Sequence, residues 1–394
     1  MTTPWYLEPS TYRSFVEQTS ITEEEYVASI EEVLAVIPLS EAQKYVDDLL
    51  KRDGHLTGPF YIHPVPFNIL IRHPLKMFLG ASIGDFWALA DVVKFGLDLL
   101  CTRDIPGVAA IRRDLRNQDQ YVGRLFEIEL LAELVRANAM PQIKGTPDFS
   151  GEIGGLKFLM EARHRGVAFP QAIVSQLTTS LGFKEFGELA VQLAPVGGKG
   201  ELVSEVASSI GAQILSLIEH TGERSREIST GAFTIRHDPT GGPRSVTFSY
   251  GKGTYAEDLA VLVSSALIGK ERQLQSSAHG NCVRIVALDL RALFPALPVE
   301  NAKDATAPAW LGYYGQRIPE WRNAILGSCK DFLNSPTVVT GVLLWFRSPA
   351  SVSWRDLNKY FLSTYSGILI TRNGIVELSN AEEFRNAFAS NFST

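Results

Sequence analysis

Hydrophobic residues in the first 110 positions recur mainly with the period of an α-helix. Polar residues that can cap a helix precede the amphipathic stretches at 20–33 and 40–51, and a longer apolar helix is expected at 85–100. Four prolines within 58–74 predict a loop with one short extended piece. The pattern therefore predicts a helical N-terminal region, residues 1–110.

From residue 121 the pattern changes to that of an α/β protein. It predicts a helix at 121–139, a short strand near 148, a tight turn at 151–155 and a strand at 156–163. Further along, it predicts helical structure at 170–222, a hairpin at 233–250, a helix at 255–277, a strand at 283–290, a helix at 319–334 and a strand at 338–346. We expect one core at 111–350, interrupted by an insertion at about 170–250, and a C-terminal extension at 351–394.

One carboxylate of the helix at 121–139 lies on its apolar side. The residues that follow Glu127 at helical spacing are Leu130, Leu131, Leu134 and Val135. A buried carboxylate is costly unless it is paired or binds a metal, so Glu127 is a candidate site residue. Glu129 and Glu133 fall on the other side and carry no such signal. Pairing of Glu127 with Arg124, one turn back, is the alternative.

Two further acidic residues belong to the predicted strands that follow. Asp148 comes after Pro147 at the start of the first strand, and Glu161 lies near the end of the second, two residues before Arg163. Because side chains alternate along a strand, Glu161 and Arg163 point to one face. Asp148 and Glu161 on paired strands could converge on Mg²⁺ or Mn²⁺. The alternatives are a turn-capping aspartate and a solvated Glu161–Arg163 ion pair.

This order of residues resembles the PD-(D/E)XK, or restriction-endonuclease-like, nuclease superfamily. The matching elements are the helix with Phe126-Glu127, then Pro147-Asp148, then Glu161-Ala162-Arg163. The resemblance implies a mixed sheet flanked by helices and metal-dependent hydrolysis of phosphodiester bonds. It implies that Asp148 and Glu161 bind the metal, and that Glu127 supports the metal directly or through water. The strand lysine of the family is replaced by Arg163, which can bind a phosphate but cannot transfer a proton.

A later helix offers a lysine in compensation. Lys270 continues the apolar stripe of the helix at 255–277, and Gln273 follows about one turn later. The resemblance extends to members of the superfamily in which such a helix presents Lys or Gln toward the site. We therefore expect Lys270 to supply the missing ammonium; alternatively, it marks the polar end of its helix. His164, Arg165 and Gln273 are candidate substrate-binding residues.

Bulk properties narrow the class of protein without identifying it. The chain has 394 residues, 45% hydrophobic and 20% charged, with a net charge of −6, so a nucleic-acid site would be a local basic groove. The three cysteines, Cys101, Cys282 and Cys329, are odd in number and widely spaced, which favours a reducing compartment. Neither a spanning helix nor a signal peptide is expected, so the predicted location is the cytoplasm, with no membrane partner.

Two functions other than a nuclease remain open at this stage. One is a catalytically lapsed nuclease-fold domain that binds nucleic acid or protein, which the replacement of the strand lysine by Arg163 favours. The other is a serine hydrolase centred on Ser82, within Gly80-Ala-Ser-Ile-Gly84, although Ser82 and Asp85 also fit a helix cap. The expected partner is nucleic acid, DNA before RNA, and the N-terminal helices could serve a homodimer or a protein partner.

Overall fold

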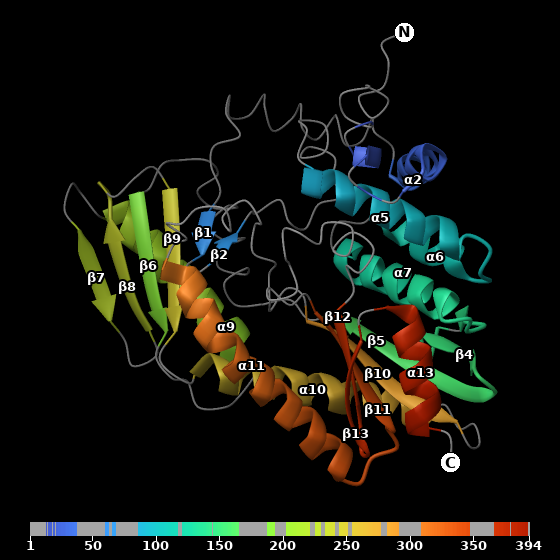
Figure 1. Cartoon of the computed structure of the whole chain (residues 1–394). Coiled ribbons are helices and arrows are strands. Elements are labelled where there is room, and N and C mark those ends of the chain that lie inside the picture. The colour runs from blue at the N-terminus through green and yellow to red at the C-terminus, as the bar shows by residue number, and fades with distance from the viewer. Residues whose placement is uncertain are drawn as a thin grey trace.

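The computed structural model of the chain contains a large sheet covered by helices and a second, smaller sheet beside it (Figure 1). The structure describes residues 13, 15–17, 19, 21–37, 60–62, 65–67, 86–116, 120–143, 145–164, 187–193, 202–220, 225–229, 233–240, 244–250, 254–276, 282–290, 309–346, 366–378 and 380–392. The helix expected at 40–51 and the Ser82 motif lie outside these residues.

The larger sheet has seven strands of mixed direction. In spatial order they are β13 (Gly374–Leu378), β12 (Ser366–Thr371), β11 (Gly341–Phe346), β10 (Val283–Asp289), β5 (Leu156–His164), β4 (Phe149–Ile153) and β3 (Gln142–Ile143). The central strands β5, β10 and β11 are parallel, and the outer pairs are antiparallel. The expected strand at 338–346 is thus confirmed as part of the same sheet.

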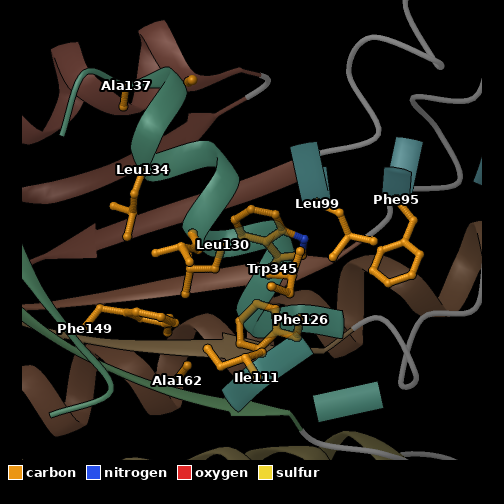
Figure 2. Packing of buried hydrophobic residues seen from close by; sticks show 14 of the residues in the cluster. Phe95, Leu99, Ile111, Phe126, Leu130, Leu134, Ala137, Phe149, Ala162 and Trp345 are labelled. Atoms are coloured by element: carbon orange, nitrogen blue, oxygen red, sulfur yellow. The ribbon is translucent and has the colours of Figure 1, made fainter. Parts of the chain in front are cut away.

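Helices cover both faces of this sheet. They are α7 (Tyr121–Arg136) and α13 (Ala381–Phe392) on one face, and α10 (Thr254–Ser276) and α11 (Ala309–Asn334) on the other. Alternation along β5 divides its side chains between the two layers: Met160 and Ala162 pack toward α7, whereas Leu159 packs toward α10. Figure 2 shows part of the first layer, where Phe126 meets Trp345 edge to face with ring centroids 5.8 Å apart. The fold is therefore mixed α/β, as predicted.

The N-terminal helices share the hydrophobic core of the α7 layer. They are α2 (Glu23–Val36), α5 (Phe86–Thr102) and α6 (Val108–Asp114). Thr22 and Glu25 form the capping box that starts α2. A Cβ on Gly96 would stand 2.0 Å from the backbone oxygen of Ser29, so glycine lets α5 approach α2 closely. Two short strands, β1 (Phe60–Ile62) and β2 (Val65–Phe67), come between α2 and α5 in the sequence and pair with each other.

Four strands between β5 and α10 form the second sheet, and here two predictions are wrong. Its strands, in spatial order, are β7 (Arg226–Ser229), β8 (Phe233–Asp238), β6 (Gly187–Leu193) and β9 (Arg244–Tyr250), with α9 (Leu202–His220) beside them. The strand β6 lies within the stretch expected to be helical, because Leu189 and Val191 alternate into a core. The strands β8 and β9 do not form a hairpin, since β6 lies between them and pairs with both.

The C-terminal residues, which the sequence pattern sets apart as an extension, contribute two strands and a helix to the larger unit. The strand β12 pairs with β11, and α13 packs Phe388 against Phe158 of β5 with ring centroids 6.0 Å apart. Within the described ranges, none of the helices has the length and apolar character needed to cross a membrane.

Candidate metal centre

The pairing of β4 with β5 places two carboxylates side by side. Phe149 is paired with Met160 in an antiparallel register, so Asp148, one residue earlier, stands opposite Glu161. The Asp148 carboxylate also accepts a hydrogen bond at Oδ2 from the backbone N–H of Ala162, at 2.8 Å. Residues directly opposite each other in an antiparallel pair share a face of the sheet. Both carboxylates therefore lie on the face that α10 covers.

A lysine from α10 meets both carboxylates. The ammonium Nζ of Lys270 lies 2.6 Å from Glu161 Oε2 and 3.2 Å from Asp148 Oδ2. The residues before it on the same side of α10, Leu259, Val263, Ala266 and Leu267, are buried in the core on this face. Lys270 thus interrupts an apolar stripe that Leu274 continues, and the sheet beneath it presents two acids at that point. The structure brings together Asp148, Glu161 and Lys270, as the sequence pattern predicted.

Glu161 is the most strongly perturbed member of this group. It is only 1% exposed, and burial raises its pKa to about 7, against the hydrogen bond from Lys270 and with a further rise from the charge of Asp148. Its second oxygen, Oε1, is buried and has no hydrogen-bond partner among the described residues. A buried acceptor without a partner costs free energy, so this oxygen is ready to take a ligand.

Glu127 lies beside this group and not within it. Its carboxylate accepts a hydrogen bond from Arg124 at 2.6 Å, and Arg124 also reaches Asp114 at 3.1 Å. Burial raises the pKa of Glu127, Arg124 opposes that rise, and the charge of Asp148 adds to it. Glu127 therefore forms the ion pair with Arg124 that the sequence offered as the alternative to a metal-binding role. The charge of Asp148 nevertheless raises the pKa of Glu127.

The remaining predicted residues are more dispersed. Arg163 is exposed near the end of β5, Gln273 is exposed on α10, and Arg165 lies outside the described residues. The Nδ1 atom of His164 lies 2.8 Å from Oδ2 of the buried Asp289. Because His164 is an odd number of residues from Glu161, it projects from the opposite face of β5. His164 is thus held by Asp289, away from Lys270.

The donor set suits Mg²⁺ or Mn²⁺ without forming a complete cage. Among the residues that the structure describes, no three His, Cys, Asp or Glu side chains are grouped so that they could hold a metal ion. The expected trio of Glu127, Asp148 and Glu161 is therefore not assembled as three ligands, because Glu127 is turned to Arg124. Mg²⁺ commonly uses one or two carboxylates and keeps several waters, so Asp148 and Glu161, with the unpaired Oε1, fit it.

A second group of buried charges was missed by the sequence pattern. The carboxylate of Asp98 on α5 is 2.8 Å from Lys94 and 2.6 Å from Arg136 of α7. Glu133 pairs with Arg136 at 2.6 Å, and Glu129 lies 3.7 Å from Lys94. The prediction that Glu129 and Glu133 carry no signal is thus wrong, because α5 covers the side of α7 that the apolar stripe leaves open.

Asp289 was also missed, although a signal for it exists. It ends the apolar run of β10, where a fully buried carboxylate needs a partner. The identity of that partner depends on the register of β5 against β10, in which His164 stands beside Asp289. That register cannot be read from either strand alone.

The chain was compared with protein-family models, with curated proteins and with solved structures, and none of the three comparisons finds a match.

Proposed function

We propose that the chain is a metal-dependent nuclease of restriction-endonuclease-like fold, which hydrolyses phosphodiester bonds of DNA or RNA. The observation that carries the proposal is the contact of Lys270 with both Asp148 and Glu161, which precede it in the chain by 122 and 109 residues. Three residues singled out for one chemistry thus meet at one place. The mixed sheet with helices on both faces is the second support.

Each residue has a role in this proposal. Asp148 and Glu161 hold Mg²⁺ or Mn²⁺, and Glu127 supports the site through water. Once bound, the metal would lower the pKa of a coordinated water and offset negative charge on the phosphate. Arg163, which is exposed on β5 two residues after Glu161, binds a phosphate oxygen. Lys270 donates hydrogen bonds to phosphate or to the attacking water.

Substrate contacts beyond the phosphate are assigned more broadly. Gln273, exposed one turn after Lys270 on α10, and Arg165, just after β5, are the proposed contacts to the nucleic-acid chain. His164 remains a proposed substrate contact at the end of β5. Its ring is held by Asp289, so the substrate would have to reach it there. A substrate would therefore lie along the ends of β5 and α10.

The test is cleavage of plasmid DNA, linear duplex, single-stranded DNA and RNA by the full chain, in Mg²⁺, Mn²⁺ or EDTA. We expect cutting that needs the metal and is lost in Asp148→Asn. The matched control is Asp331→Asn, an aspartate exposed on α11, which should cut like the wild type. Equal cutting by wild type and Asp148→Asn would refute the site.

The second candidate is a domain of the same fold that binds nucleic acid or protein without cutting it. Arg163 favours it, because an arginine in place of the strand lysine cannot transfer a proton. Retention of DNA or RNA by folded protein in EDTA, with no cleavage in either metal, would select this function over the nuclease.

A further inference from the structure

We propose that Lys270 is a built-in competitor for the metal: its ammonium bridges Asp148 and Glu161 until the metal displaces it onto the substrate phosphate. This inference rests on the proposed function and adds a regulatory step to it. Its consequence is that metal and nucleic acid bind with positive coupling. The metal releases the Lys270 ammonium to the phosphate, and the phosphate holds that ammonium away from the metal-binding carboxylates.

The geometry places the ammonium where a cation would be bound. Its Nζ lies within hydrogen-bond distance of one oxygen from each carboxylate, Asp148 Oδ2 and Glu161 Oε2. Asp148 Oδ2 already accepts the Ala162 N–H, and Glu161 Oε1 has no partner among the described residues. One ammonium therefore serves two carboxylates and leaves one carboxylate oxygen open.

The two cations cannot share this position. A divalent ion held by Asp148 and Glu161 would stand within a few ångströms of the ammonium, and like charges at that distance repel strongly in a buried site. The Lys270 side chain is 11% exposed, and its four-carbon stem lets the charged end move while α10 stays in place. Metal binding therefore has to move the ammonium away from the carboxylates.

A displaced ammonium needs a new anionic partner. The substrate phosphate approaches the same site, so it is the group that takes up the freed charge. Thermodynamic reciprocity then requires that nucleic acid strengthen metal binding by the same factor by which metal strengthens nucleic-acid binding. A lysine with a purely structural role would produce no such coupling.

The first experiment is titration of the wild type and of Lys270→Gln with Mn²⁺, following bound Mn²⁺ by electron paramagnetic resonance. We expect Lys270→Gln to bind Mn²⁺ at least tenfold more tightly, because the competing charge is gone and the amide can still donate to a carboxylate. The matched control is Lys157→Gln, which removes an exposed lysine from the same strand as Glu161 and should bind like the wild type.

The second experiment needs no substitution and so does not depend on how a variant folds. The wild type is acetylated briefly with and without saturating Mn²⁺, and the modification of each lysine is measured by mass spectrometry. We expect Lys270 to react several-fold faster with Mn²⁺ and Lys157 to be unchanged.

A third experiment returns to the variant: a short DNA duplex with hydrolysis-resistant phosphorothioate linkages should tighten Mn²⁺ binding in the wild type and not in Lys270→Gln.

The outcomes separate this inference from the function on which it rests. Absence of Mn²⁺ binding in both proteins would defeat the metal site and with it the competition. Equal or weaker Mn²⁺ binding by Lys270→Gln, or unchanged reactivity of Lys270 when Mn²⁺ is bound, would overturn the competition and leave the metal site standing.

Discussion

Two groups of buried charges in this molecule are built differently. Between α5 and α7, both oxygens of Asp98 are engaged, one by Lys94 and the other by Arg136. Between β5 and α10, Lys270 serves both Asp148 and Glu161, and one oxygen of Glu161 has no partner among the described residues. The first group satisfies its central carboxylate, whereas the second leaves capacity for a ligand.

The pKa shifts of Lys94 and Glu161 follow the same division, although burial also raises the pKa of Glu133 in the first group. Burial acts to lower the pKa of Lys94, but Asp98 and Glu129 raise it above its usual value, so this lysine is held charged. Burial raises the pKa of Glu161 to about 7, and its partners do not cancel that rise. A cluster that serves only the fold is expected to be electrostatically matched, while a binding site keeps a mismatch that its ligand removes.

The largest expected effect on stability is in the matched cluster. Replacement in Asp98→Ala leaves Lys94 and Arg136 without their common partner, and we expect the free energy of unfolding to fall by about 3–5 kcal/mol. Urea denaturation measures it, with Asp331→Ala on the surface of α11 as a control that should change it by no more than about 0.5 kcal/mol. A loss in Asp98→Ala as small as that of the control would remove the distinction between the clusters.

In the unmatched cluster the expected effect is on activity. Glu161→Gln keeps the shape of the side chain but removes the charge, so we expect cleavage to fall about 100-fold or more. The free energy of unfolding should change by only about 1 kcal/mol, because the buried charge that is lost was itself costly. The control is Glu152→Gln on β4, and comparable cleavage by these two variants would contradict the assignment.

The raised pKa of Glu161 predicts a pH dependence of stability in the absence of metal. Its pKa is about 7 in the folded chain against the ordinary 4.5 of a glutamate in the unfolded chain, so between these values the folded chain keeps a proton that the unfolded chain releases. This contribution is fully present below about pH 4.5 and is lost as the pH rises through about 7. Denaturation in EDTA should show wild type losing stability relative to Glu161→Gln by at most about 1.4 kcal/mol per pH unit. If the unfolding free energies of the two proteins varied with pH in the same way, the raised pKa of Glu161 would be contradicted.

The smallest effect is expected at the edge of the site. Arg124 links Glu127 to Asp114, but its side chain is 32% exposed, so solvent weakens both ion pairs. We expect Arg124→Gln to cost about 1 kcal/mol or less in unfolding free energy. Cleavage should fall by no more than about tenfold, the lower end for groups that orient a site from outside. A larger loss of cleavage would make Glu127 a more direct participant than its contacts indicate.

The local pattern of the sequence was enough to predict the residues of the unmatched cluster. Lys270 follows an apolar stripe at helical spacing, and Glu161 sits in a strand whose alternation sets its face. Asp148 precedes the turn that pairs the two strands, so its approach to Glu161 follows from a short hairpin. Each of these placements needs only neighbours in the sequence, whereas the approach of Lys270 to the two carboxylates was expected from the family resemblance alone.

Non-local pairing explains what could not be predicted. The position of β6 between β8 and β9 depends on strands that are far apart in the chain. The contact of His164 with Asp289 depends on the register of β5 against β10, 125 residues away. The ion pairs of Glu129 and Glu133 could not be predicted either, because α5 packs against a second side of α7, away from its apolar stripe.

The most direct test of the central claim is a crystal structure of the wild type with Mn²⁺, with the ion located by its anomalous scattering. The account predicts a peak within coordination distance of Asp148 and Glu161, with Lys270 turned away from both carboxylates. A structure at saturating Mn²⁺ without a peak there, and with Lys270 still bridging Asp148 and Glu161, would contradict it.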